Sequence, residues 1–590
     1  DKMASSKDDS TNGMIASDYK EPHELPSLPA GLSADSLLVS ALTGEARKSS
    51  MRDLSASRYA GGGDTIPRSP TKSVVINLPE EPPSKRMRTH TNAAPIDAVV
   101  SGINSSVNYV DRINAIRVAH QSFDHGIQLT HDREIAAGAD VALCKHLSLL
   151  LYKAQSEEMD RERHAAAAAA TGADSSSRTT TPDPVNAIPD LESGEGGGVI
   201  EELGSTCEVM EAVYRCSADT VATSFARLGS ELLPMLIKIT NHEVRRRRDR
   251  QAASSATASE GDQQQQLDPL IDARDLILKK STKILGHFAR IGSLTQPLAY
   301  HPGLLSCLRR VISCPIGLVP RECRLNALWI VANLACNAEN MVMMACHPDL
   351  LETLVGPAHR PIEDEEADIG DIDLFMEALR SRDIAIRAIF NLSWAPENKL
   401  LLSEHANLVE ALLRTLMYRV SSWGGFGRGV SGILLQSRKH AACALRNLAA
   451  APRRNKQILC RQAVNGTLLD KISDSARNDP DSEVREKALA ALNNLACSTT
   501  AEEFVKRAET LEILADSALL ETDDQEGGTA SHALRVLEKS IPEDDENYAL
   551  LKPHLDKVAA AKQDITTEEG QAQEDASEGG AQEEAKEGEE

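Results

Sequence analysis

Apolar residues recur at three- and four-residue spacing through the middle of the chain, and this pattern predicts helices. Four segments share one arrangement: an apolar helical run, then Asn-Leu-Ala or Asn-Leu-Ser, then a short break. They read RLNALWIVANLACNAEN, DIAIRAIFNLSWAPENK, KHAACALRNLAAAPRRNK and EKALAALNNLACSTTAEE. Because one pattern returns four times, the sequence predicts a helical repeat protein.

Each repeat is predicted to contain a long helix, a short helix and a medium helix. The long helix carries the signature asparagine, which is Asn333, Asn391, Asn447 or Asn494. A second asparagine follows in three repeats, at Asn340, Asn398 and Asn455, just before the next apolar run. Since an asparagine side chain can accept a bond from a free N–H at a helix start, these three are expected to be N-caps. The medium helix is predicted from the runs DLLETLV, NLVEALLRTL, GTLLDKIS and LEILADSALL.

The signature asparagines are 58, 56 and 47 residues apart. A regular repeat of this kind has about 40 residues, so at least two repeats are expected to carry insertions. The candidates are PIEDEEADIGDID, which begins at Pro361, and SSWGGFGRGVSG, which begins at Ser421.

Composition separates the repeats from the two ends of the chain. Residues 1–93 are rich in Ser, Pro, Gly and Lys without a sustained apolar period, which predicts a disordered head. Residues 564–590 consist mainly of Glu, Gln, Ala and Gly, which predicts a disordered acidic tail. The helical solenoid is expected over residues 94–563, with its clearest repeats at 320–540.

Two low-complexity stretches interrupt the predicted solenoid, at about 171–198 and 245–266. Both are expected to be surface loops between helices. The second begins with Arg245 to Arg248, followed by Arg250. This basic cluster is expected at a helix end, where cations complement the helix dipole.

The three-helix unit with its Asn-Leu-Ala signature resembles the armadillo repeat. The resemblance implies an all-α fold, a right-handed armadillo-type α-solenoid whose stacked repeats form a concave groove. In armadillo families this asparagine faces the groove and holds the main chain of an extended ligand, because an amide offers both a donor and an acceptor. The resemblance implies that role for Asn333, Asn391, Asn447 and Asn494. A structural role, in which the amides bond to neighbouring helix ends, is the alternative, and both can hold.

Trp329 precedes Asn333 by one helical turn and shares its face. This pair resembles the groove of importin-α-type nuclear-import adaptors, in which stacked Trp rings grip Lys and Arg side chains. The equivalent positions in the following repeats hold Arg387, Cys443 and Ala490, so the chain has no array of tryptophans.

Arg387, together with Arg446 beside Asn447, predicts that part of the groove is positive and favours an acidic segment. The alternative is that Trp329 belongs to the core and that the arginines are simply solvated.

The head contains PPSKRMR, in which Lys85, Arg86 and Arg88 resemble a short nuclear-localisation signal. The nucleus is therefore favoured over the cytoplasm. Ser69 and Thr181, each followed by proline, are candidate phosphorylation sites, and a phosphate on Ser69 would add charge near this signal.

Charge and cysteine usage exclude several classes of protein. The net charge of −24 argues against direct nucleic-acid binding, and no apolar run approaches the roughly 18 residues of a membrane span. The eleven cysteines include no C-x-x-C pair, which indicates a reducing compartment.

No phosphate-binding loop, G-x-S-x-G elbow, H-E-x-x-H motif or paired-cysteine zinc spacing is found. The sequence therefore predicts no catalytic residues, no metal, no cofactor and no small-molecule substrate. The expected function is a scaffold or adaptor that binds an extended segment of a protein partner. The alternatives are an importin-α-type adaptor and a constitutive subunit of a chromatin or remodelling complex, and third an enzyme, which a polar pocket with shifted pKa values would support.

Overall fold

The structure is a computed structural model, and it describes residues 139–172, 196–215, 217–257, 270–359, 372–418, 428–462, 467–521 and 528–563. All these residues belong to one compact unit, Ala60–Glu590. Within the described ranges every regular element is a helix and no strand occurs. The predicted head and tail, residues 1–93 and 564–590, lie outside them.

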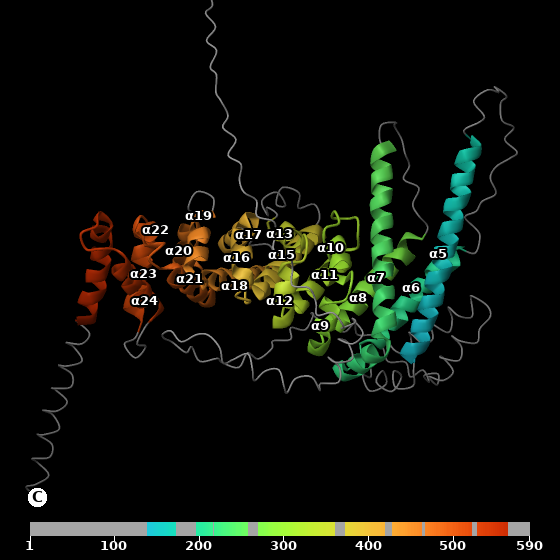
Figure 1. Cartoon of the computed structure of the whole chain (residues 1–590), viewed down its shortest axis with the longest axis horizontal. Helices are drawn as coiled ribbons and strands as arrows, with labels where there is room; N and C mark the ends of the chain where they lie inside the picture. The colour runs from blue at the N-terminus through green and yellow to red at the C-terminus, as the bar shows by residue number, and fades with distance from the viewer. Residues whose placement is uncertain are drawn as a thin grey trace, which may run out of the picture. The chain divides into compact units, whose positions relative to one another are not determined.

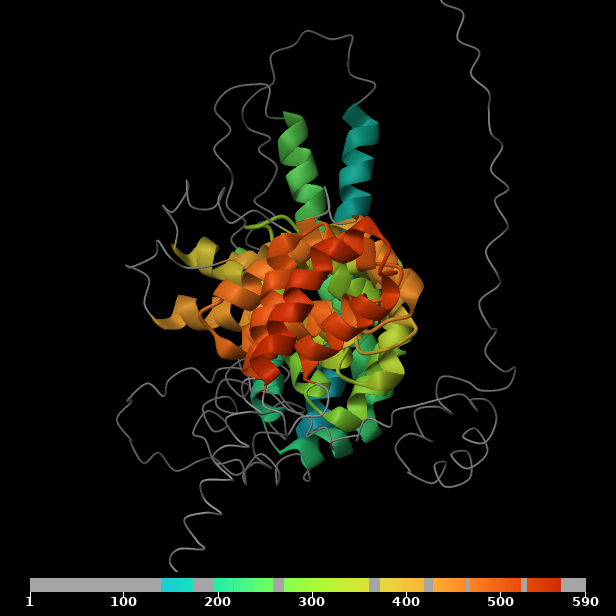
Figure 2. The same ribbon diagram turned by 90° about the vertical axis from the view of Figure 1, so that its left-hand side faces the viewer.

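Seven helices that each pack on the next form what we call the signature row, because four of them carry the signature asparagines (Figures 1 and 2). They are α6 (Gly196–Val213), α8 (Ile271–Ala289), α11 (Arg321–Leu334), α15 (Ile372–Leu392), α18 (Arg428–Ala449), α21 (Ser482–Leu495) and α24 (Thr529–Ser540). Before them, α5 (Ala139–Gly172) packs on α6 and α7.

Two further rows complete the repeats. The short row is α9 (Gly292–Ala299), α12 (Ala338–Ala345), α16 (Asn398–Glu404), α19 (Arg453–Gln462) and α22 (Ala501–Val505). The medium row is α7 (Ala218–Thr257), α10 (Leu304–Ile312), α13 (Leu350–His359), α17 (Ala406–Met417), α20 (Thr467–Asn478) and α23 (Ala508–Leu520). Each medium helix packs on the next, and a last helix spans residues 546–563. The predicted order of long, short and medium helices is therefore observed.

Small apolar residues explain why the signature helices lie so deep in the stack. In α15, seven residues are at most 2% exposed: Leu379, Ile384, Ala385, Ile386, Ala388, Ile389 and Leu392. These positions cover more than one side of the helix, because neighbouring signature helices pack on two sides and the medium helix on a third. The alanines leave room for these close approaches.

The insertion candidates fall at one kind of junction, between a medium helix and the next signature helix. Residues 360–371 follow α13 and residues 419–427 follow α17, and both segments lie outside the described residues. The last part of the second candidate is helical, because α18 begins at Arg428. Val430 and Leu434 of this first part of α18 pack in an apolar cluster with Phe375 and Leu379 of α15, which explains the helix.

Asn340 and Asn398 are not N-caps, so that prediction is wrong. Asn337 caps α12, with its side chain accepting from the N–H of Glu339, and α16 already includes Asn398. The two asparagines are instead buried, at 0% and 1% exposure. Asn455 likewise lies within α19 and is buried.

The buried amides join consecutive repeats. Asn398 Nδ2 donates to the carbonyls of Leu392, 2.9 Å away, and Met341, 3.0 Å away. Asn340 Nδ2 makes the equivalent pair of bonds, 3.0 Å each, to the carbonyls of Leu334 and Thr295. In each case one carbonyl ends the preceding signature helix and the other lies in the short helix of the preceding repeat.

The expected loop at 245–266 is wrong for residues 245–257, which continue α7. Arg245 to Arg248 therefore lie inside a helix and not at its end. Two of these side chains bind structure beyond α7, which explains why the helix continues: Arg247 pairs with Asp275, and Arg248 donates to the Arg310 carbonyl. The ends of the other low-complexity stretch, 171–172 and 196–198, belong to α5 and α6.

An arginine stands nine residues before each signature asparagine, at Arg324, Arg382, Arg438 and Arg485. The first three are buried. Three of the four donate to the segment that ends the preceding medium helix, and Arg382 instead contacts the residue that follows α17, the next medium helix. Arg324 donates to the carbonyls of Cys314 and Pro315, Arg438 to that of Tyr418, and Arg485 to that of Asp479. The Arg382 guanidinium lies 6.0 Å from the centre of the Tyr418 ring. These arginines hold the medium row against the signature row.

Candidate functional site

The signature residues of successive repeats form a line of side chains across the signature row, which we call the signature face. It runs from Trp329 and Asn333 on α11, through α15 and α18, to Asn494 on α21. Trp329, Asn333 and Asn494 are partly exposed, whereas Asn391 and Asn447 are 8% and 6% exposed.

Three signature asparagines bond to the end of the preceding signature helix. Asn391 Nδ2 lies 2.9 Å from the Ala332 carbonyl oxygen, and Asn494 Nδ2 lies 3.2 Å from that of Arg446. Asn447 Nδ2 lies 3.0 Å from Ser393 Oγ. These three asparagines therefore have the structural role, in which the amide bonds to a neighbouring helix end. In each bond the amide nitrogen is the donor.

Asn333 differs from the other three. Its side chain is partly exposed and makes no hydrogen bond to a described residue. The Oδ1 of Asn391 likewise accepts from no described residue, whereas that of Asn447 accepts from Arg446. Asn333 can therefore offer a donor and an acceptor to a ligand main chain, and Asn391 an acceptor.

Trp329 and Arg387 cover one another. The Arg387 guanidinium carbon lies 4.8 Å from the centre of the Trp329 ring, and Arg387 is only 5% exposed. The expectation that Arg387 makes an exposed positive groove is wrong, because its charge is stacked on the indole of the preceding repeat. Arg446 remains partly exposed.

An aromatic group just after the end of α15 was missed by the sequence reasoning. Trp394, at 48% exposure, makes an edge contact with Phe390 at 6.0 Å between ring centres. Phe390 in turn stacks on His440 of α18 at 5.9 Å. The signal was available, since Trp394 stands three residues after the signature Asn391, where the other repeats have Cys336, Ala450 and Cys497.

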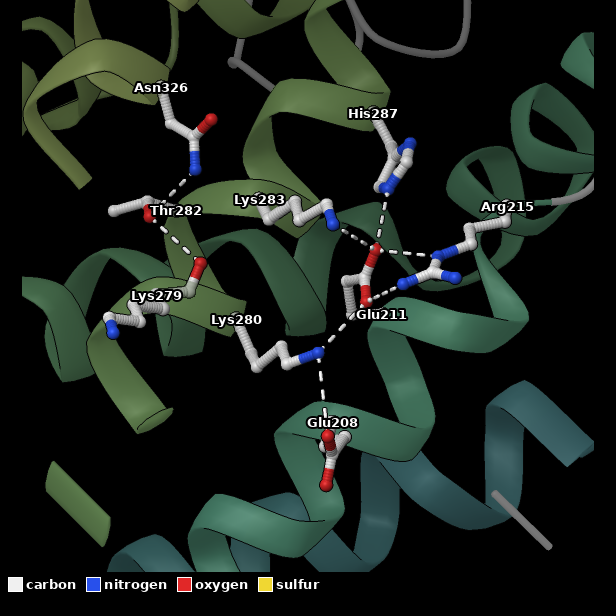
Figure 3. A network of polar contacts seen from close by, with 9 residues as sticks. All are labelled: Glu208, Glu211, Arg215, Lys279, Lys280, Thr282, Lys283, His287 and Asn326. Atoms are coloured by element: carbon white, nitrogen blue, oxygen red, sulfur yellow. Dashed lines mark hydrogen bonds and ion pairs between the residues drawn. The ribbon is translucent and has the colours of Figure 1, made fainter. Parts of the chain in front are cut away.

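In the earlier repeats an ionic cluster replaces the amide bonds (Figure 3). His287 occupies the signature position of α8, and its Nε2 lies 3.2 Å from Glu211 Oε1 on α6. Arg215 donates to both oxygens of Glu211 at 3.0 Å. Lys280 Nζ lies 3.3 Å from Glu211 Oε2, and Lys283 Nζ lies 3.4 Å from Glu211 Oε1. Glu211 itself is fully buried.

The cluster holds its carboxylate in the charged form. Burial raises the pKa of Glu211, but hydrogen bonds from His287 and Arg215 and the charges of Lys283 and Lys280 outweigh it. The pKa therefore lies well below its usual range. For His287 burial dominates and lowers the pKa, although the bond to Glu211 opposes it. A neutral imidazole thus donates to an ionised carboxylate, and the cluster joins α6 to α8.

The edges of this cluster are more exposed. Lys280 also lies 3.6 Å from Glu208, one helical turn before Glu211. Separately from this cluster, the buried Thr282 hydroxyl of α8 accepts a 3.5 Å bond from Asn326 of α11, which links these two signature helices.

Within the described ranges, no three His, Cys, Asp or Glu side chains are gathered closely enough to hold a metal ion. In the same part of the chain, no helix has the length and apolar character needed to cross a membrane. The candidate nuclear signal at Lys85, Arg86 and Arg88 and the phosphorylation candidates Ser69 and Thr181 lie outside these residues.

No protein-family model matches the chain, and no curated protein sequence matches it. The solved structures that the chain matches include an engineered protein, 20% identical with a TM-score of 0.33, where the match covers 46% of this chain and 94% of that one. The karyopherin Kap121p bound to the SUMO protease Ulp1p is 13% identical, with a TM-score of 0.29 and coverage of 80% and 42%. A structure from work on the interaction between cadherin and beta-catenin is 13% identical, with a TM-score of 0.25 and coverage of 75% and 85%. At these scores none of the three assigns the chain to a family.

Proposed function

We propose that the chain is an armadillo-type repeat scaffold, without catalytic activity, that binds an extended segment of a partner protein along the signature face. The observation that carries the proposal is Trp394, a half-exposed tryptophan at the end of a signature helix in the middle of the stack. Exposed aromatic side chains of this kind dominate the binding energy of many interfaces.

The spacing of the repeats fits an extended ligand. Packed helices lie about 8–10 Å apart, and an extended chain advances about 3.3 Å per residue, so each repeat meets two or three ligand residues. In this arrangement Asn333 bonds the ligand main chain, the Oδ1 of Asn391 accepts a ligand N–H, and Trp394 receives an apolar or aromatic side chain.

A binding experiment tests the proposal. Peptides of random sequence are selected on the full chain, and their dissociation constants are then measured with Trp394→Ala. We expect binding to weaken by about 2 kcal/mol or more, roughly thirtyfold, because truncating a central aromatic removes a hot spot. Tyr300→Ala is the matched control, since Tyr300 is also half exposed, at 49%, but lies after α9 in the short row.

Tyr300→Ala should leave the affinity within about twofold, as expected for an exposed residue outside the interface. Equal affinities for the wild type and Trp394→Ala across all selected peptides would contradict the proposal. A fall in melting temperature for Trp394→Ala would instead indicate a structural role for the ring.

The alternative of an importin-α-type adaptor requires tryptophan faces that are open to ligand Lys and Arg side chains. At Trp329 one such face already carries the chain's own Arg387. The alternative of a constitutive chromatin or remodelling-complex subunit stays a hypothesis that shares the same binding surface.

Location is tested separately from binding. We expect that changing Lys85, Arg86 and Arg88 to Ala moves a tagged chain from the nucleus to the cytoplasm, because the basic run is the proposed address. The measurement is the nuclear fraction in fluorescence images, and the control that removes the same three positive charges changes the exposed Lys506, Lys539 and Lys552 to Ala. A wild type that stays cytoplasmic when nuclear export is blocked excludes the address.

A further inference from the structure

Four arginines of the medium row form a group that the proposed scaffold function does not use. Arg245 and Arg248 lie on α7, and Arg309 and Arg310 lie on α10, the next helix of the row. We call them the arginine patch. Arg245 and Arg310 are exposed, and the other two are partly exposed.

The patch crosses from one helix to the next, because contacts join Arg248 of α7 to Arg310 of α10. Asn241, Arg245 and Arg248 are four and three residues apart and so share one face of α7. Arg310 donates to Asn241 Oδ1 at 3.0 Å. In return Arg248 donates to the Arg310 carbonyl at 3.2 Å and to Ser313 Oγ at 3.0 Å.

The acceptors that hold Arg248 and Arg310 are an amide, a carbonyl and a hydroxyl, all of them neutral. The two guanidinium groups are therefore fixed in place without losing their charge to a carboxylate. This differs from the neighbouring Arg247, which is paired with Asp275 of α8.

Two carboxylates border the patch, and neither of them pairs with Arg248 or Arg310. Asp249 lies 3.8 Å from Arg245, and both side chains are largely exposed, at 72% and 86%. A contact of this kind contributes little. Asp349 pairs with Arg309 at the side nearest α13. The patch thus keeps a local excess of positive charge on a chain whose net charge is −24.

We propose that the arginine patch is a second docking surface, which binds a carboxylate-rich segment of a partner protein. Planar guanidinium groups bind carboxylates through two parallel hydrogen bonds, and groups already held in position lose less freedom on binding. A short acidic segment of a protein is small enough for all its carboxylates to lie on the patch. A nucleic acid carries one charge about every 1.7 Å along a duplex and would extend beyond the patch on a chain whose net charge is −24.

The test uses the full chain and a fluorescein-labelled deca-glutamate peptide at low salt, where surface attraction is least screened. The variant is Arg245→Glu with Arg310→Glu, which changes the two exposed members. The control is Lys506→Glu with Lys552→Glu, which makes the same change in net charge at exposed lysines after α22 and in the helix 546–563. We expect the peptide to bind about tenfold more weakly to the patch variant, and the control to change by less than about threefold.

Several outcomes would overturn the inference. These are absence of peptide binding to the wild type, equal loss in the patch and control variants, and unchanged binding in a patch variant with a native melting temperature. Tighter binding of a single-stranded oligonucleotide, with the same dependence on Arg245 and Arg310, would identify a nucleic-acid surface instead. Trp394→Ala should bind deca-glutamate like the wild type, so the patch and the signature face are tested independently.

Discussion

Replacing Glu211 with alanine is expected to lower the free energy of unfolding by about 3–5 kcal/mol, because removing one partner of a buried ionic cluster leaves the others uncompensated. Glu211 is fully buried and is the shared partner of Arg215, Lys280, Lys283 and His287. Without it, Lys280 keeps only its contact with Glu208, and His287 loses its acceptor.

The matched control is Glu208→Ala, one helical turn earlier on α6. The Glu208 side chain is 31% exposed and lies 3.6 Å from Lys280, so its loss should cost less than about 1 kcal/mol. Urea unfolding measures the difference, and amide hydrogen exchange should show the lost protection in α6 and α8, since each repeat depends mainly on its neighbours. Equal destabilisation by the two variants would show that the cluster is not a specific link.

The same cluster predicts a pH dependence. The folded pKa of Glu211 is lowered, so its contribution is present above the ordinary value of about 4.3 and is lost as the pH falls below it. The folded pKa of His287 is also lowered, so the unfolded chain takes up this proton first, from about pH 6.5 downward. Both groups therefore make the wild type less stable in acid, and Glu211→Ala should lose stability less steeply below about pH 4.3.

The second large effect is expected at Arg324. Arg324→Ala should lower the free energy of unfolding by about 3–5 kcal/mol, because it leaves a buried carboxylate and two carbonyls without their donor. Arg324 pairs with Glu377, and both side chains are 4% exposed. It also donates to the carbonyls of Cys314 and Pro315, at 3.0 and 2.8 Å.

Arg321→Ala on the same helix is the matched control for Arg324→Ala. Its ion pair is with Asp373, whose side chain is 83% exposed, so the loss should stay below about 1 kcal/mol. Thermal and urea unfolding of the two variants distinguish the cases. A loss of less than about 1 kcal/mol for Arg324→Ala would exclude a major role for the recurrent arginine.

Periodicity was sufficient to predict the helices and their order, because apolar spacing and the repeated Asn-Leu signature are local properties of the sequence. For Asn391, Asn447 and Asn494 it left a groove role and a structural role open, and the structure shows their bonds to the end of the preceding signature helix. Periodicity failed at Asn340 and Asn398, where a local capping rule competes with bonds to carbonyls in the preceding repeat. Those bonds depend on how two repeats meet, which single-segment patterns do not contain.

At the candidate site too, contacts between repeats could not be predicted from single segments of the sequence. A tryptophan at position 329 and an arginine at position 387 are each compatible with an open groove, but the two side chains stack because α11 and α15 are neighbours. Conversely, the recurring arginines nine residues before each signature asparagine were visible in the sequence. They would have been found by aligning the repeats beyond the apolar positions.

The junction between medium and signature helices has a consequence for how this chain can change in length. Only residues 313–320 and 479–481 separate α10 from α11 and α20 from α21, whereas longer segments follow α7, α13 and α17. The turns from the signature row to the short row stay brief throughout, with residues 335–337 after α11 and 450–452 after α18. Added residues at the first kind of junction leave all three rows intact, so it is a natural place to graft reporters or epitopes. Grafts at successive repeats would each lie at the same kind of junction, one per repeat along the stack.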